Sequence, residues 1–352
     1  MAEITLGKSI IGRSSPAFVI AEIGHNHQGE LEKAKKMIEV AAECGADAVK
    51  FQKRYNKTLF TKAMFDKPYD NENSFGVTYG EHREFLEFGK KEFVELMQCA
   101  KDNNVEFMCT AFDFESADFL EDLGVRSFKF ASGDLTNTPL LEYVAKKGKP
   151  MFISTGAATF EEIKLAYETV IKYNKQICFL QTTCVYPADY DQLNLRAIEM
   201  MAKEFPEAVM GYSGHDNGIL AGVVAYMLGA TVIEKHFTLN RSSKGTDHKF
   251  SLEPEGLRKQ VRDLRRVDVA LGKPEKVVYS YEASAKAKMG KSVYTTKDLP
   301  KGHVITAADL SLKSPAGGLP PYRMAAVVGK ALSADLAAET MLASDHIVGG
   351  VA

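Results

Sequence analysis

The segment TVIEKHFT, residues 231–238, has the apolar residues of a buried β-strand, but Glu234, Lys235 and His236 stand at its centre. Buried polar groups are costly unless they are paired, so a core strand that carries three of them needs an explanation. Successive side chains of a strand point to opposite faces, which places Glu234 and His236 together and Lys235 on the other face. We expect the first two to face a functional site, and Lys235 to extend among outer helices with its ammonium group at the surface.

The same pattern recurs along the chain in short apolar runs that end in polar residues. These runs are FVIAEIG (18–24), DAVKFQK (47–53), VEFMCTAF (105–112), SFKFASG (127–133), PMFISTG (150–156), ICFLQTT (177–183) and VMGYSGH (209–215). Segments with helical periodicity lie between them, such as residues 159–171, where Thr159 and Glu162 have capping-box spacing. Thr138 is the predicted N-cap of another helix, with Pro139 at its first position. Eight strand–helix units in roughly 250 residues predict a (β/α)₈ TIM barrel, and an open doubly wound sheet is the structural alternative.

The barrel pattern does not cover the whole chain. Residues 1–15 have the pattern of a short hairpin that closes the barrel, and residues 16–273 form the predicted catalytic barrel. Residues 274–288 are a polar segment, which we interpret as a helix-poor linker. Residues 289–352 contain short β-like pieces separated by PKG, SPAGGLPP and SDH, so they predict a separate small domain that is rich in turns.

The composition is that of an ordinary globular protein. The chain has 352 residues, of which 45% are hydrophobic and 26% charged, and its net charge of −2 gives no electrostatic reason to expect nucleic acid or an anionic membrane as a partner. Its five cysteines have no paired spacing, so we expect reduced thiols. The N-terminus lacks the apolar stretch of a signal peptide, and no apolar run has membrane-spanning length. We expect a cytoplasmic protein.

The polar residues of the eight runs all stand near the ends of the predicted strands. In a barrel these ends form the carboxyl-terminal rim, where active sites are built. The set consists of Glu22, Lys50, Gln52, Thr110, Lys129, Ser132, Ser154, Thr182, Ser213, His215, Glu234 and His236. One such residue alone is typical of a hydrogen-bonded core position, but their recurrence in eight strands favours a site.

Two kinds of chemistry fit this set. His215 and His236 end neighbouring strands, so both imidazoles can bind one divalent metal ion that acts as a Lewis acid. Lys50 and Lys129, with several hydroxyl groups, suit a substrate that carries phosphate and carboxylate groups. A lysine that forms a Schiff base, as in class I aldolases, is the catalytic alternative. His25 and His27 follow the first strand, and we interpret them as loop or substrate contacts.

The chain also resembles a known family, the sialic acid synthases. The motifs that carry the resemblance are AEIGHNHQG, GADAVKFQK, FKFASGD, GYSGHDNGI, EKHFTL and KGTDHKFSLEP. The likeness covers almost the whole chain and includes a C-terminal antifreeze-like β-clip domain, matched by GKSVYTTKDLPKGHVITAADL. It implies an enzyme that condenses phosphoenolpyruvate with N-acetylmannosamine or its 6-phosphate. It also implies a bound divalent metal, Mn²⁺ first and Mg²⁺ or Co²⁺ as alternatives, and a domain-swapped homodimer.

The resemblance assigns roles to individual residues. His215 and His236 match the metal ligands, and the acid that handles protons is either Glu22 or Glu234. The residues that match the phosphoenolpyruvate site are Lys50, Thr110, Lys129, Ser132, Ser154 and Ser213, with Lys286 of the linker as a further candidate. Those that match the sugar site are Glu22, Gln52, Tyr186, Glu234 and Asp247. Among them, Glu22, Lys50, Lys129 and Glu234 are the candidate catalytic residues.

Some positions depart from the bacterial synthases and leave the sugar open. Cys184 replaces the usual asparagine or serine, and Ser314 stands where an arginine of the small domain contacts the N-acetyl group. Residues 66–88 resemble the corresponding loop of the animal 9-phosphate synthases, and their length favours a lid or a substrate contact. Lys53 and Arg54 are positioned to meet a sugar phosphate. Mannose 6-phosphate or a di-N-acetylated hexose stay alternative substrates, and a non-enzymatic ice- or glycan-binding protein is disfavoured because it leaves the rim unexplained.

Overall fold

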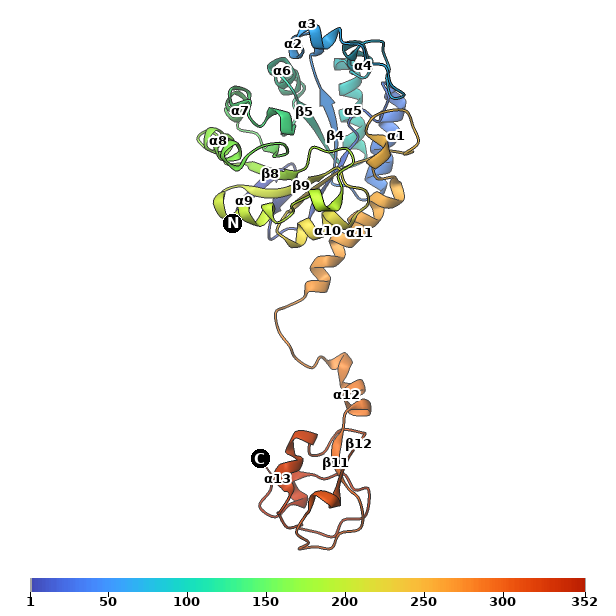
Figure 1. Cartoon of the computed structure of the whole chain (residues 1–352), viewed down its shortest axis with the longest axis vertical. Helices are drawn as coiled ribbons and strands as arrows, with labels where there is room; N and C mark the ends of the chain where they lie inside the picture. The colour runs from blue at the N-terminus through green and yellow to red at the C-terminus, as the bar shows by residue number, and fades with distance from the viewer. Residues whose placement is uncertain (1, 352) are drawn as a thin grey trace. The chain divides into compact units, whose positions relative to one another are not determined.

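The computed structural model describes residues 2–351, which form two compact units, one ending at Gly272 and one beginning at Lys273. In the first unit, eight parallel strands close into a barrel in which β10 pairs with β3. Helices surround the strands (Figure 1). The predicted TIM barrel is therefore confirmed, and the alternative of an open sheet is wrong because a closed barrel leaves no sheet edge. The strands are β3 (Phe18–Glu22), β4 (Ala48–Lys53), β5 (Glu106–Ala111), β6 (Phe128–Phe130), β7 (Met151–Ser154), β8 (Ile177–Thr182), β9 (Val209–Gly214) and β10 (Val232–His236).

Each strand is followed by one main helix that packs an apolar face on the barrel. These helices are α1 (Leu31–Glu43), α5 (Lys90–Asp102), α6 (Phe114–Leu123), α7 (Thr138–Ala145), α8 (Phe160–Val170), α9 (Ala197–Glu204), α10 (Leu220–Met227) and α11 (Pro254–Leu271). The capping box at the start of α8 is present, with Thr159 and Glu162 as partners. The prediction for α7 is wrong by one residue: Asn137 is the N-cap, its side chain accepts from Leu140 N, and Thr138 begins the helix.

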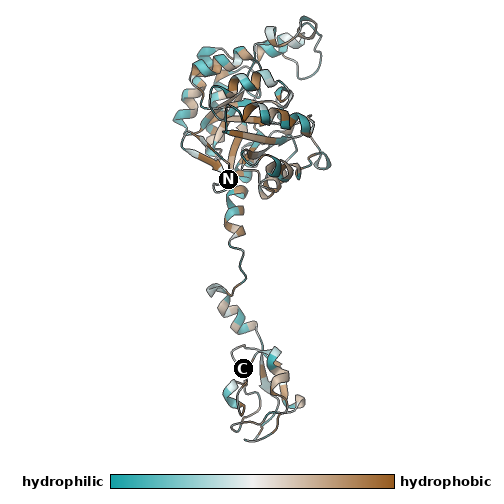
Figure 2. Ribbon diagram, turned by 90° about the vertical axis from the view of Figure 1, so that its left-hand side faces the viewer, coloured by the Kyte–Doolittle hydropathy of each residue, from teal (hydrophilic) through white to brown (hydrophobic). Residues whose placement is uncertain are grey.

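The barrel interior has two chemically different layers. Its lower part is filled by apolar side chains of alternate strand positions, including Ile20, Met108 and Val232. Two residues further along β3 and β10 stand Glu22 and Glu234, so the same face changes from apolar to charged toward the carboxyl ends. The apolar strands stand out in brown against the mixed colours of the surrounding helices (Figure 2). The sequence positions the polar side chains at one end of the barrel because each strand makes this change in its last residues.

A hairpin closes the opposite end of the barrel. It consists of β1 (Glu3–Leu6) and β2 (Ser9–Gly12), which pair antiparallel. Ile4, Leu6 and Ile11 are fully buried and belong to the same apolar cluster as the lower barrel interior. These contacts exclude water from the floor of the barrel.

The segment between β4 and α5 is folded. It contains three short helices, α2 (Asn56–Leu59), α3 (Lys62–Phe65) and α4 (Tyr79–Phe85). Aromatic side chains hold it together, since Phe75 stacks on Phe85 with ring centres 5.1 Å apart and Tyr69 packs against His82. A long βα segment with its own packing can place side chains at the rim.

The second unit contains little regular structure. Its elements are α12 (Ala283–Met289), β11 (Ser292–Thr295), β12 (Leu310–Lys313) and α13 (Met324–Val327). The strands β11 and β12 pair antiparallel over a small apolar cluster around Val293 and Leu342. The expectation of a helix-poor linker at 274–288 is wrong, because α12 occupies its second half; alanine and lysine in ASAKAKM have high helix propensity.

Candidate active site

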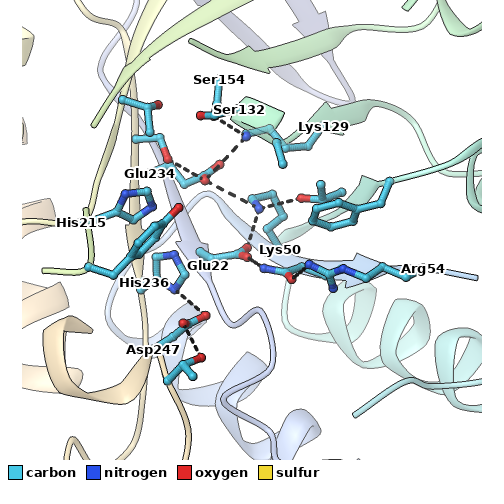
Figure 3. Close-up of a pocket in the computed structure, with 18 of the residues that line it drawn as sticks. Glu22, Lys50, Arg54, Lys129, Ser132, Ser154, His215, Glu234, His236 and Asp247 are labelled. Carbon is cyan, nitrogen blue, oxygen red and sulfur yellow. Dashed lines mark hydrogen bonds and ion pairs between the residues drawn. The ribbon is translucent and has the colours of Figure 1, made fainter. Parts of the chain in front are cut away.

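A cavity of about 650 Å³ opens at the carboxyl ends of the barrel strands. Figure 3 shows its side chains, which come from strands on all sides of the barrel. All the predicted site residues of the barrel line it: Glu22, Lys50, Gln52, Thr110, Lys129, Ser132, Ser154, Tyr186, Ser213, His215, Glu234, His236 and Asp247. Thr182 lines it as well. Lys286, the remaining predicted residue, lies in α12 of the second unit.

One side of the charged cluster is centred on Lys50. Its ammonium nitrogen lies 2.6 Å from Glu22 Oε2 and 3.6 Å from Glu234 Oε1, and it donates to Thr110 Oγ1 at 2.9 Å. Gln52 donates to the other oxygen of Glu22 at 2.7 Å. Lys50 therefore has two carboxylates within reach and is held in place by a neutral hydroxyl.

The other side is centred on Lys129. Its nitrogen donates to Ser154 Oγ at 2.6 Å and to the Phe130 carbonyl at 2.8 Å, while Glu234 Oε1 is 4.0 Å away. Burial lowers the pKa of Lys129 to about 8. An anion that approaches Lys129 meets an ammonium group whose charge is only loosely balanced by protein.

The pKa values of the two buried glutamates are shifted in opposite directions. Burial raises the pKa of Glu22, an effect that the nearby charge of Lys50 only partly offsets. Burial acts on Glu234 in the same direction, but Lys129 and Lys50 outweigh it and lower the pKa of that carboxyl. Ser213 donates to Glu234 Oε1 at 3.0 Å, whereas Glu234 Oε2 has no hydrogen-bond partner among the described residues. Two neighbouring carboxyls with pKa values shifted apart suit separate roles as acid and as ionised acceptor.

His215 and His236 stand side by side on the opposite wall, with ring centres 5.4 Å apart. His215 Nδ1 donates to the Thr183 carbonyl, 2.8 Å away, because a carbonyl oxygen can only accept and therefore fixes that nitrogen as the N–H. The lone pair of His215 is therefore on Nε2. His236 Nδ1 is buried without a hydrogen-bond partner in the described chain, 3.7 Å from Asp247 Oδ2.

These imidazoles fit a divalent metal ion. Burial, followed by the nearness of His236, lowers the pKa of His215 to about 4, and burial also lowers the pKa of His236, so both rings are neutral and keep a lone pair. Within residues 2–351, no three histidine, cysteine, aspartate or glutamate side chains gather into a complete metal cage. A metal bound here has the two histidines as ligands and keeps positions open for other molecules, as a Lewis-acid site requires.

The expectation for Lys235 is partly wrong. It does point away from Glu234 and His236, but its ammonium group does not reach the surface: the side chain is fully buried, with its nitrogen 2.8 Å from Asp216 Oδ1 and 2.6 Å from the Asp216 carbonyl. Tyr212 donates to the same carboxylate oxygen at 2.6 Å. Lys235 forms a buried ion pair because Asp216, which follows the end of β9, lies beside it.

Several lining residues were not predicted from the sequence. Glu72, Asn73 and Arg83 reach the cavity from the inserted segment, and Lys249 reaches it from the loop after β10. Asn73 Oδ1 accepts from Gly245 N at 3.0 Å, which joins these two loops. For the three residues of the insertion, the signals were its length and its resemblance to the animal 9-phosphate synthases, since a loop conformation cannot be read from periodicity. Lys249 belongs to the motif KGTDHKFSLEP, but its own position gave no signal.

The remaining expectations near the rim have mixed outcomes. Arg54 lines the cavity, whereas Lys53 turns away and binds Glu87 and the Phe88 carbonyl at 3.1 and 3.0 Å. His27 is buried and stacks on Phe88 with ring centres 4.3 Å apart, so it has a structural environment. All five cysteines are free. No helix among the described residues has the length and apolar character needed to cross a membrane.

Comparison with known proteins identifies the family. Residues 37–276 match the NeuB family, and residues 290–348 match the SAF domain. The chain belongs to the NeuB family. This membership confirms the resemblance to sialic acid synthases and the expected enzyme class, and the second match confirms the antifreeze-like domain.

Relatives in the NeuB family differ in their named products. A human N-acetylneuraminate-9-phosphate synthase is 43% identical over 321 residues, which cover 91% of this chain and 89% of the human protein. An N,N'-diacetyllegionaminic acid synthase of Legionella pneumophila is 39% identical and covers 96% of both chains. The solved N-acetylneuraminic acid synthetase of Leptospira borgpetersenii has a TM-score of 0.70 at 34% identity, over 80% of this chain and 94% of that chain. The family thus defines a nonulosonate synthase without defining the sugar.

Proposed function

We propose that this enzyme condenses phosphoenolpyruvate with the open-chain aldehyde of an N-acylated amino sugar, giving a nonulosonic acid and inorganic phosphate. The observation that carries the proposal is one cavity in which two buried lysines face two neutral, adjacent histidines. The lysines match the phosphate and carboxylate of phosphoenolpyruvate. The histidines match a divalent ion, with Mn²⁺ proposed first, and such an ion would polarise the sugar aldehyde when bound.

The bonds formed and broken follow from the reactants. C3 of phosphoenolpyruvate attacks the aldehyde carbon, and the new carbon–carbon bond leaves a cation at C2. A water molecule adds to C2, and the tetrahedral intermediate then loses phosphate by cleavage of its C–O bond. Two proton transfers need protein groups: one proton must reach the former aldehyde oxygen, and one must leave the water molecule as it adds to C2. The second proton of that water leaves with the phosphate as the C2 carbonyl forms.

The two glutamates suit these two proton transfers. Glu22 keeps its proton more readily because burial raises its pKa, so we assign it the donation to the aldehyde oxygen. Glu234 is ionised, and its free Oε2 is an acceptor for the proton of the added water. Lys129, Ser154 and Lys50 hold the phosphoenolpyruvate anion in this scheme, with Thr110 and Ser213 fixing Lys50 and Glu234.

Further parts of the proposal concern the assembly. We propose a cytoplasmic homodimer in which the second unit of one protomer, including Lys286, completes the cavity of the other. The support for this arrangement is that the same chain carries a SAF domain, which forms a compact unit of its own. Analytical ultracentrifugation of the full chain and of a chain ending at residue 272 would test it.

The direct test is phosphate release from phosphoenolpyruvate with Mn²⁺. Purified enzyme is offered N-acetylmannosamine, its 6-phosphate, mannose 6-phosphate and a di-N-acetylated hexose, and we expect release with an N-acylated sugar and loss of it with EDTA. Release with none of the four sugars would refute the proposal. Covalent trapping of pyruvate by borohydride, with indifference to EDTA, would instead support the class I aldolase alternative.

A further inference from the structure

Arg54 and Arg83 reach the cavity from different segments and approach the same histidine. Arg54 follows β4 and is buried, and its guanidinium stacks on the Phe112 ring with Cζ 3.6 Å from the ring centre. Arg83 lies in α4, so the inserted segment brings it to the cavity. Arg54 Nη1 is 3.3 Å from His25 Nε2, and Arg83 Nη1 is 3.3 Å from His25 Nδ1. The histidine thus lies between two guanidinium groups.

This arrangement leaves one guanidinium donor without an acceptor. Burial, together with the charges of Arg54 and Arg83, holds the pKa of His25 well below its usual range, so its ring is neutral. A neutral imidazole has one lone pair and one N–H, and arginine has donors only. Only one of the two contacts is therefore a hydrogen bond, and in the other two N–H groups face each other. A group with several acceptor oxygens beside this trio would satisfy both arginines.

The charges of the two arginines are also poorly neutralised by protein. The nearest carboxylate oxygen to Arg54 is Glu87 Oε1 at 3.9 Å, and Glu87 is already bound to Lys53 at 3.1 Å. Across residues 2–351, no carboxylate oxygen lies within 4.0 Å of the Arg83 guanidinium. Burial, followed by repulsion from Arg83, lowers the pKa of Arg54 to about 10. Two close cations of this kind favour a bound anion.

The other charged residues of this part of the lining do not change that balance. Glu72 and Lys249 carry opposite charges. The carboxylate of Asp247 faces His236, which is the first charge that lowers its pKa, ahead of Arg83. The excess positive charge therefore stays with the two arginines.

The arginine pair is separate from the lysine cluster. Lys50, Gln52 and Arg54 are alternate residues of the chain. Side-chain contacts connect them in series: Lys50 lies 2.6 Å from Glu22, Gln52 donates to Glu22 at 2.7 Å, and Gln52 accepts from Arg54 Nη2 at 2.7 Å. Because these two positions are four residues apart in extended chain, the Cα atoms of Lys50 and Arg54 are separated by about 13 Å. The cavity thus has two cationic ends, one at the lysines and one at the arginines. A substrate with its own phosphate fits the second end while phosphoenolpyruvate occupies the first.

We infer that Arg54, Arg83 and His25 form a binding subsite for a phosphomonoester, so that the sugar acceptor is a hexosamine phosphate whose phosphate group lies far from the reacting aldehyde. The inference rests on the proposed condensation and names its substrate class. Arg54 and Arg83 share the phosphate oxygens as donors, and the single lone pair of His25 accepts from one of the two arginines. The chemistry is shared by inorganic phosphate, so the test separates the two sources.

The test compares Arg83→Gln with the wild type on N-acetylmannosamine 6-phosphate and on N-acetylmannosamine, at saturating phosphoenolpyruvate. For the wild type we expect kcat/KM at least 100-fold higher with the phosphorylated sugar, since a bidentate contact to a dianion is lost with the other sugar. Arg83→Gln should lower kcat/KM for the phosphorylated sugar by 10- to 100-fold, mainly through KM. It should change kcat/KM for the other sugar less than twofold, and leave KM for phosphoenolpyruvate unchanged. Lys62→Gln, which removes a cation from an exposed side chain of the same insertion, is the matched control and should change neither.

The outcomes distinguish the possible failures. A wild type that prefers the unphosphorylated sugar, or an Arg83→Gln variant that slows both sugars equally, would overturn the subsite but leave the condensation standing. Inorganic phosphate that competes with sugar, in an enzyme without preference for the phosphorylated one, would mean that the arginines bind free phosphate, and this also overturns the inference. No phosphate release with any sugar would refute the condensation itself. Thermal unfolding verifies that Arg83→Gln is folded, and Arg83→Lys, which keeps the charge without the planar fork, should give an intermediate preference.

Discussion

On strand β10, Lys235 points away from the barrel axis, while Glu234 and His236 point toward it. On the outer side, one lysine meets one aspartate at hydrogen-bond distance, and neither residue lines the active-site cavity. On the inner side, Glu234 lies 3.6 and 4.0 Å from two lysines that border a cavity of about 650 Å³. Both faces bury charge to the same degree, but the inner face borders a cavity with space for a further charged molecule, whereas the outer pair does not line that cavity.

The difference shows how buried charge can serve structure or chemistry. Closing an ion pair fixes two strands relative to each other, and removing one partner then leaves an uncompensated charge. An open cluster pays a similar desolvation cost without tight pairing, so its groups stay available for a ligand. We therefore expect substitutions on the outer face to change stability, and substitutions on the inner face to change catalysis.

Lys235→Ala should have the largest effect of the outer face. It leaves the Asp216 carboxylate buried without its cation, and we expect the free energy of unfolding to fall by about 3–5 kcal/mol. Urea unfolding followed by circular dichroism measures it. The double variant Lys235→Met with Asp216→Leu removes both charges and should recover most of the loss; a single variant as stable as the wild type would show that the pair contributes little.

Lys129→Met, on the inner face, should have the opposite effect to Lys235→Ala: it should reduce catalysis and leave stability intact. The variant keeps the length of the side chain but removes the charge that faces the anion, so kcat/KM for phosphoenolpyruvate should fall about 100- to 1000-fold. Its urea midpoint should stay at or above that of the wild type, because a buried charge is lost. Large loss of stability with nearly unchanged kcat/KM would mean that the two faces do not differ as we describe.

Tyr212→Phe tests the outer face with a smaller expected loss of stability than Lys235→Ala. It removes one donor to Asp216 and leaves Lys235 in place, so the unfolding free energy should fall by about 1.5–3 kcal/mol. Because Tyr212 is directed to the outer face, KM for phosphoenolpyruvate should stay within twofold. A change of more than twofold in that KM would instead connect the outer ion pair to substrate binding.

The smallest expected effect is a pH dependence that belongs to the inner face alone. Lys129 has a pKa lowered to about 8, so its charge is lost as pH rises through that value, and kcat/KM for phosphoenolpyruvate should fall up to about tenfold per pH unit above it. Between about 8 and the ordinary lysine value of 10.5, the unfolded chain binds more protons than the folded one, so this lysine makes stability rise with pH. Lys129→Arg stays charged and should lose the break near pH 8; a break that persists in that variant would belong to another group.

The sequence was sufficient for the barrel and for the side of each strand that faces the cavity. Alternation fixes direction within a strand, which is why Glu234 and His236 were placed together and Lys235 apart. It does not fix the stagger between strands, so the pairing of Lys235 with Asp216 at the end of β9 could not be foreseen. The one-residue error at Asn137 has a similar local origin, since asparagine and threonine are both good caps.

The arginine subsite shows where sequence reasoning ends. Arg54 directly follows a strand, so its place at the rim could be considered from the sequence. Arg83 depends on how about thirty inserted residues pack on aromatic side chains, and no periodic pattern carries that information. The meeting of Arg54, Arg83 and His25 is a tertiary property, and it decides which sugar we expect.

The hairpin of residues 3–12 has an electrostatic consequence for chemistry at the far end of the barrel. Its buried Ile4, Leu6 and Ile11 keep the medium beneath Lys50 and Lys129 weakly polarisable. If this insulation were removed, water entering from below would screen the ammonium groups, move the titration of Lys129 back toward alkaline values and weaken its pull on an incoming anion. A hairpin at the far end of the barrel thus helps to set the electrostatic potential around the two lysines.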